Sequence, residues 1–451
     1  MINAATGEQD TKPIHYFSID TEYVYWNFFL DFGPLNLGHL YRYCQKLNDK
    51  LVDPGLRDYI IVYYSSAAPT KRTNAAYLIC AWQILYLHLT PEDAFSGFKK
   101  GPRSPHSVIE GVSSSDSNIY TLQPFHDASP CECTYNLTVL DCLRGLAKAR
   151  DYGFFNFETF DVNEYEYYEQ VEVRLYLVLC IGVWYCILRC VPLAILTLID
   201  FVSCLSSQNG DLNWIIKDKI LAFAGPHYRR NITAEGYCTL TPHDYIKYFQ
   251  QKNVGLVVRL NKKCYDENDF IQAGIDHFEQ YYLDGSCPPM SILHKVVAAF
   301  EANDERGFAV HCKAGLGRTG TCIGAYIMKH YRLTAAEVIG WMRICRPGMV
   351  IGPQQHFLAD IEQRMWHEGS VMSNRPGRGI FASVKERLGR DSKGLNYDKY
   401  SQGGAARTKL AIGDDNEEEG GVAQRKEEEI CGQGDSLRAR RVEAKRQSQQ
   451  R

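Results

Sequence analysis

One ten-residue segment combines a nucleophile with a cation: positions 311–320 read HCKAGLGRTG, and five residues separate Cys312 from Arg318. A thiolate can attack the phosphorus of a phosphate monoester and form a cysteinyl-phosphate intermediate. The guanidinium of Arg318 can donate two parallel hydrogen bonds to phosphate oxygens. We therefore expect phosphate hydrolysis at Cys312, stabilised by backbone amides and arginine, without a metal or other cofactor. The expected phosphate-binding loop consists of Lys313, Ala314, Gly315, Leu316 and Gly317.

Other polar residues fit the remaining steps of that reaction. His311 can orient the loop through backbone hydrogen bonds, and the Thr319 hydroxyl can bond the sulfur as it leaves. Asp284, followed by a glycine that suits a mobile loop, is the expected general acid and later accepts a proton from the hydrolytic water. Gln354 and Gln355 could position that water. A plain turn aspartate and a helix-capping role for the glutamines are the alternative interpretations.

The elements around Cys312 should form an anion cradle. Phe308–Val310 is apolar and short enough for a buried strand, and Arg318–Tyr331 has the pattern of a helix. Loop amides and the amino end of that helix would both face a bound anion, and glycines permit its close approach. The same positive field should lower the pKa of the Cys312 thiol.

The surrounding region alternates short apolar strands with helices. This alternation predicts a parallel sheet covered on both faces. Thr334 and Glu337 predict a capping box at one helix start. The expected strands are Lys219–Ala224, Gly255–Leu260 and Asp276–Leu283, and the expected helices are Pro289–Ala302, Thr334–Ile344 and Pro353–Met365.

The first part of the chain contains a second strand-turn-helix unit, with an apolar strand at Tyr59–Tyr64 and a helix that runs to Leu89. Aligning Arg72 with Arg318 places Ser66 against Cys312. This copy lacks the thiol and both loop glycines. We interpret the chain as a tandem of two related α/β domains, the first without chemistry; chance similarity of two common units is the alternative.

Length and composition set the domain organisation. With 451 residues, 45% hydrophobic content and a net charge of −3, the chain is neither fibrous nor disordered as a whole, and nothing favours nucleic-acid or membrane-surface binding. The 16 cysteines match neither a disulfide framework nor a zinc pattern, and the polar start resembles no signal peptide. We expect a non-catalytic domain at 14–156, an acidic linker helix at 157–172, an apolar insert at 173–208, a catalytic domain at 209–366 and a disordered tail at 367–451.

Several motifs together resemble one family. They are LDFGP at 30–34, NLT at 136–138, GDLNW at 210–214, the Cys312 loop, and the stretch from RPG at 346–348 to Gln355. On these motifs the chain resembles the cell-division-cycle-fourteen family of proline-directed dual-specificity phosphatases. The resemblance implies two dual-specificity-phosphatase-like domains side by side, each with a central, mostly parallel sheet flanked by helices, of which only the second is active.

The resemblance also implies substrates and site residues. The family reverses cyclin-dependent-kinase phosphorylation in cell-cycle control and prefers phosphoserine-proline with a basic residue downstream. It implies that Tyr168 and Ala314 flank a proline pocket and that Asp127, Glu166 and Glu169 form an acidic groove. The sequence itself concentrates glutamates before the second domain, which favours basic substrates; a solvated acidic helix face is the alternative. The implied location is nucleus or nucleolus and cytoplasm, with centrosome or spindle, and the basic end of the tail fits nuclear import or a solvated tail. The oligomeric state is left open.

The apolar segment Val173–Gln208 interrupts the family pattern. A translated retained intron is the favoured interpretation, because its removal restores the family's join and its end codons can match splice sites. A membrane anchor is long enough but would place Arg189 and Pro192 near its centre. A soluble hydrophobic insertion is the third alternative. We expect the segment to make the chain poorly soluble.

Two other functions compete with protein dephosphorylation. Inositol-lipid phosphatases have similar loops, but their polyphosphorylated headgroups favour further lysines, whereas this loop has Lys313 and then Leu316. The second alternative is a binding or aggregating product made inactive by the insert. The intact Cys312 segment argues against it.

Overall fold

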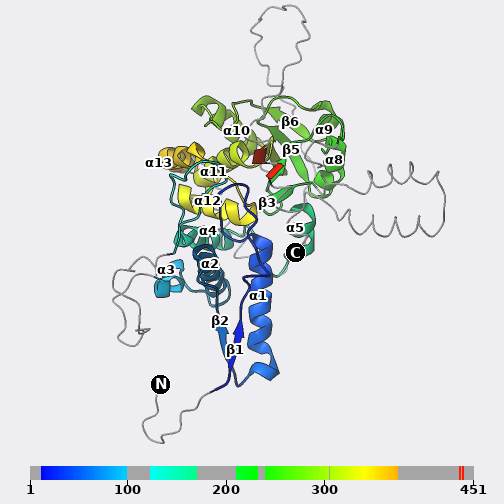
Figure 1. The fold of residues 1–451 in the computed structure, drawn as a ribbon. Coiled ribbons are helices and arrows are strands. Elements are labelled where there is room, and N and C mark those ends of the chain that lie inside the picture. The colour runs from blue at the N-terminus through cyan, green and yellow to red at the C-terminus, as the bar shows by residue number, and fades with distance from the viewer. Residues whose placement is uncertain are drawn as a thin grey trace, which may run out of the picture.

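The computed structural model describes residues 12–98, 122–169, 210–231, 239–303, 305–373, 436–437 and 439–440 (Figure 1). The apolar segment Val173–Gln208 lies outside these residues. Two α/β units are present, and they differ mainly in the size of their sheets.

The second unit is built on five strands in the order β3-β4-β7-β5-β6. β3 pairs antiparallel with β4, and the other pairs are parallel. The four strands expected in this region are therefore present as β4, β5, β7 and a shorter β6, and β7 lies in the centre with every residue buried. The bounds are β3 Leu212–Ile216, β4 Ile220–Ala224, β5 Val254–Arg259, β6 Asp276–Glu279 and β7 Gly307–Cys312.

Helices cover both faces of this sheet, as the alternation predicts. Leu221 and Phe223 of β4 pack with phenylalanines of α8 and α9 on one face of the sheet. Ile220 and Ala222 of the same strand point to the opposite face and belong to the other core cluster. Thr334 and Glu337 form the expected capping box. The helices are α8 Pro242–Gln251 and α9 Asn268–Gln272 on the first face, and α10 Met290–Ala302, α11 Gly317–Tyr331, α12 Ala335–Cys345 and α13 Pro353–Ser373 around the second.

The first unit has a much smaller sheet. Within the described residues it consists of β1 Ile14–Phe17 and β2 Ile60–Tyr63, which pair in parallel. β2 is only partly buried, unlike its counterpart β7. The helices are α1 Leu37–Val52, α2 Pro69–Tyr86, α3 Pro91–Ala94, α4 Val139–Asp151 and the linker helix α5 Val162–Glu169, with single 3-10 turns at Pro54–Leu56 and Ser96–Phe98.

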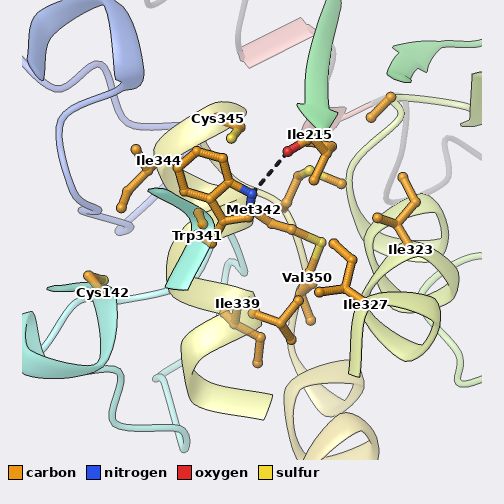
Figure 2. Close-up of a cluster of buried hydrophobic side chains, with 14 of the residues drawn as sticks. Cys142, Ile215, Ile323, Ile327, Ile339, Trp341, Met342, Ile344, Cys345 and Val350 are labelled. Carbon is orange, nitrogen blue, oxygen red and sulfur yellow. Dashed lines mark hydrogen bonds between the residues drawn. The ribbon is translucent and has the colours of Figure 1, made fainter. Parts of the chain in front are cut away.

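The two units share one core. α4 of the first packs on α12 of the second so closely that a Cβ at Gly340 would lie 2.8 Å from the Cα of Cys142. Figure 2 shows Trp341 of α12, whose indole Nε1 donates to the Ile215 carbonyl of the second unit at 3.0 Å. Because buried residues of both units belong to one continuous cluster, the first unit stabilises the second directly.

The described residues on the two sides of the apolar segment, Tyr168 and Gly210, lie next to each other. A Cβ on Gly210 would lie 3.4 Å from the ring of Tyr168, so the two flanks of the segment are adjacent. Among the residues that the structure describes, no helix combines the length and apolarity needed to cross a membrane. Adjacent flanks are what an insertion requires, because its removal leaves the surrounding fold connected.

Two features correct the expected tail. α13 continues to Ser373, beyond the expected boundary at residue 366. Farther on, Leu437 is only 3% exposed within the shared core cluster, and Arg440 lies over the ring of Phe29 at 5.8 Å. The expectation of disorder from residue 367 onward is therefore wrong for these positions, because one leucine and one arginine find partners that composition does not reveal.

Candidate active site

The segment at 311–320 forms the expected strand-loop-helix cradle. β7 ends at Cys312, and α11 begins at Gly317. Gly315 has a φ of +67°, and a Cβ there would overlap the carbonyl oxygen of Phe223. An L side chain at this position would be strained and would have no space. The loop therefore depends on the glycine that the sequence placed there.

Arg318 and Thr319 carry donor groups that the fold leaves available. Arg318 is 3% exposed, and its Nη1 donates to the carbonyls of Tyr282 at 3.0 Å and Leu260 at 3.4 Å. Among the described residues, its Nε and the Thr319 hydroxyl are buried without a hydrogen-bond partner. Buried unpaired donors are costly unless a ligand satisfies them. Both donors belong to the first turn of the helix that follows the 3% exposed Cys312, where a phosphate group could satisfy them.

Asp284 lies against the same arginine. Its Oδ1 is 3.2 Å from Nη2 of Arg318, and its side chain is 27% exposed. The preceding strand is shorter than expected, since β6 ends at Glu279 rather than reaching Leu283. Asp284 therefore sits in a turn, from which its carboxyl reaches Arg318 while remaining partly open to solvent.

His311 joins a buried hydrogen-bond chain behind the loop. Its Nδ1 donates to the Cys312 carbonyl at 3.0 Å. In the neutral ring Nε2 is then an acceptor, and it accepts from the Tyr265 hydroxyl at 2.7 Å. His277 Nε2 lies 2.9 Å from the same hydroxyl and must then be its donor. Burial lowers the pKa of His311 to about 3 and that of His277 to about 4. The expected orienting role of His311 thus has a concrete basis.

The two glutamines are both buried but are held differently. Gln354 donates from Nε2 to the Ser286 carbonyl at 3.0 Å, and its Oε1 accepts from the amide of Ile351. Its amide thus ties the turn that carries Asp284 to the start of α13, and the expected alternative of a helix-terminal role is also realised. Gln355 accepts from Arg343 at 2.7 Å and donates to the Gly352 carbonyl.

Arg346 supports the loop from beneath and was assigned no role from the sequence. It donates to the carbonyls of Ala314 and Gly315, both at 2.9 Å, and to Asp211 and Asn213 at 3.0 and 2.7 Å. Fixing two carbonyls on one side leaves the loop amides to face the other side. The motifs GDLNW and RPG were the available signals, since they contain three of these residues, but spacing alone does not reveal that they meet.

Asp127 differs from the expectation of an open acidic groove. It is 2% exposed, and its Oδ2 accepts from the amide of Gly352 at 2.7 Å. Burial alone would raise the pKa of Asp127, but hydrogen bonds from Cys133 and Gly352 and the charge of Arg343 outweigh it and lower that pKa. Asp127 therefore attaches the first unit to the segment that carries Gln354.

Three other residues expected to contact substrate, Glu166, Tyr168 and Glu169, lie on α5. Glu166 and Glu169 face α1, whereas the Tyr168 ring packs 4.3 Å from that of Tyr248. Ala314 is 5% exposed in the loop itself. A cavity of about 160 Å³ opens between α5 and the second unit; Tyr168 lines it together with Phe160, Trp214, Tyr248 and Trp341.

Comparisons with known proteins agree with both units. Residues 1–107 and 100–149 match the family described as dual specificity protein phosphatase, N-terminal half, and residues 234–332 match a family described as polymorphic toxin system, DSP-PTPase phosphatase. Human dual specificity protein phosphatase CDC14C is 41% identical over 367 residues, which cover 81% of this chain and 70% of that protein.

Two longer relatives extend this similarity. Mouse CDC14A is 44% identical over 87% of this chain and 57% of its own length, and human CDC14A is 42% identical over 96% and 63%. The chain thus spans less than two thirds of the length of these relatives. With its two α/β units, its cysteine loop and this identity, the chain belongs to the CDC14 family of dual specificity protein phosphatases.

Proposed function

We propose that this chain is a dual-specificity protein phosphatase that hydrolyses phosphoserine, phosphothreonine and phosphotyrosine through a cysteinyl-phosphate intermediate. One observation carries the proposal. Buried donors on Arg318 and Thr319, in the first turn of the helix that follows the Cys312 loop, lack partners among the described residues, while the candidate acid Asp284 contacts the same arginine.

The proposed reaction has two steps. The Cys312 sulfur attacks phosphorus, the bond to the substrate oxygen breaks, and Asp284 gives its proton to that oxygen. Water then attacks the cysteinyl-phosphate, Asp284 takes the water's proton, and the P–S bond breaks with the Thr319 hydroxyl bonded to the leaving sulfur. Loop amides and Arg318 hold the three non-bridging oxygens in both steps. Gln354, tied to the turn of Asp284, is the better placed glutamine to orient the water.

The proposed substrates are phosphoserine-proline sites with a basic residue downstream, as produced by cyclin-dependent kinases in cell-cycle control. Support comes from family membership and from the two glutamates that α5 directs at the first unit. Tyr168 and Ala314 are proposed for the proline, and Glu166 and Glu169 for the basic residue. Because Asp127 is buried and hydrogen-bonded, we give it a positioning role instead.

An inositol-lipid phosphatase is the rival activity. Leu316 is 1% exposed, so its side chain is part of the core and adds nothing to headgroup binding. Lys313 is the one lysine among residues 313–317 that could contact a second phosphate. A single lysine favours a monophosphate over a polyphosphorylated ring.

The test is turnover of the full chain on matched panels. Phosphopeptides with and without proline after phosphoserine, phosphotyrosine peptides and short-chain phosphoinositides are compared by kcat/KM. We expect hydrolysis of peptides, fastest for serine-proline with a downstream lysine. Preferred hydrolysis of the phosphoinositides would contradict the proposal. An absence of turnover on every substrate would also contradict it and would favour a chain made inactive by the apolar segment at 173–208.

A further inference from the structure

Helix α5 lies next to α1 (Figure 1), and acidic side chains of α5 contact polar side chains of α1. Asn36, His39 and Arg42 follow one another at intervals of three along α1, and Glu166 and Glu169 have the same spacing on α5. Residues three apart share one face of a helix. The two faces therefore meet in register.

Direct bonds connect the two faces. Arg42 donates from Nε to Oε1 of Glu166 at 2.6 Å and from Nη2 to Oε2 at 2.7 Å, so both carboxylate oxygens are engaged. Asn36, the N-cap of α1, donates from Nδ2 to Glu169 at 3.3 Å. The first unit thus already presents a guanidinium to the carboxylate proposed to recognise a basic substrate residue.

Among the described residues, Arg42 is the cation bonded to Glu166. Burial lowers the pKa of His39, which stays neutral at pH 7, and Tyr23 stacks on it at 5.3 Å. Lys46, one turn farther along α1, pairs with Glu22 instead.

We propose that Arg42 is a specificity-determining residue that competes with the substrate's basic side chain for Glu166. This inference rests on the proposed use of Glu166 in substrate selection. The side chains of Arg42 and Glu166 are 42% and 33% exposed, and such exposed pairs contribute little to stability. An incoming lysine or arginine can therefore replace Arg42 at little cost, and Arg42 limits how strongly a basic substrate is preferred.

The experiment measures one ratio in the full chain. It is kcat/KM for a phosphoserine-proline peptide with a downstream lysine divided by that for the same peptide with glutamine there. Arg42→Gln is expected to raise the ratio about three- to tenfold at low salt, because the carboxylates lose their internal cation. The gain should shrink at high salt, since these groups are exposed. Arg42→Lys keeps the charge without the fork and should give a smaller rise.

Matched controls separate this inference from the function beneath it. Lys46→Gln removes the same charge from the same helix without touching Glu166 and should leave the ratio unchanged. Glu166→Gln should lower the ratio; if it does not, the proposed use of Glu166 is wrong. If Glu166→Gln lowers the ratio but Arg42→Gln leaves it unchanged or lowers it, Arg42 only positions Glu166 and the inference is overturned. A thermal unfolding midpoint within a few degrees of wild type shows that Arg42→Gln is folded.

Discussion

The strand-turn-helix units of the two domains start from similar local sequences and end in different environments. β2 and α2 enclose a turn where Ser66 is exposed, while β7 and α11 enclose the loop where Cys312 is 3% exposed. β2 lies in a two-stranded sheet, whereas β7 is the central strand of five. A central strand delivers its loop into a buried site with neighbours on both sides, and an outer strand delivers it to solvent.

The neighbours of the second loop explain what the first has lost. Arg346 holds two loop carbonyls and a glycine allows the loop to pass Phe223, so the amides can converge. In the first unit α2 starts with Pro69, which has no amide hydrogen to donate. Retaining the strand and helix therefore does not retain an anion site.

The largest expected effect comes from changing the residue at the same position of each turn, Cys312 in the second unit and Ser66 in the first. Cys312→Ser should reduce kcat on phosphopeptides roughly 10⁴-fold or more, because the nucleophile is lost. Ser66→Ala, the equivalent change in the first unit, should leave kcat unchanged. The measurement is steady-state phosphate release by both full-length variants. A comparable loss in Ser66→Ala would show that the first unit also contributes chemistry.

Asp284→Asn should lower kcat on phosphoserine peptides by about 10²-fold or more, because an alkoxide leaves poorly without a proton. An aryl phosphate with an acidic phenol needs that proton less and should lose clearly less of its rate. The two substrates are compared on the same variant. Equal losses would indicate that Asp284 acts by holding Arg318 rather than by proton transfer.

Asp211→Asn should destabilise the second unit by about 3–5 kcal/mol, because it removes the negative charge that pairs with the fully buried Arg346. In the first unit Asp20 accepts from the Ser66 amide in an exposed turn, and Asp20→Asn should cost about 1 kcal/mol or less. Urea unfolding gives both values. Similar costs would mean that the two loops are supported equally.

The smallest effect concerns pH. The folded pKa of His277 lies at about 4, below its unfolded value, so the unfolded chain binds more protons as pH falls below about 6.5. Its contribution to stability is therefore present at pH 7 and declines towards pH 4, by about 2 kcal/mol between pH 7 and 5. In His277→Gln, the free energy of unfolding measured with urea should fall by about 2 kcal/mol less between pH 7 and pH 5 than in wild type. An unchanged slope would show that His277 titrates normally.

The chain order of elements and most of the Cys312 loop could be predicted from the sequence. Strand and helix periodicity placed β5, β7 and α11, and Cys312, Arg318 and Gly315 were identified because their chemistry depends on spacing along a single loop. Arg346 and Tyr265 were missed, since their partners lie far away in the chain and no local pattern marks them.

The sequence alone determined which atoms can react, because a nucleophile, its cation and its glycines fit within ten residues. Tertiary structure decided which of the two similar turns forms the candidate site. It also decided which carboxylates face solvent and which bond to other groups of the protein. Asp127 holds Gly352, and Glu166 holds Arg42. A carboxylate's role depends on its burial and its nearest donor, and both are set by packing between residues distant in the chain.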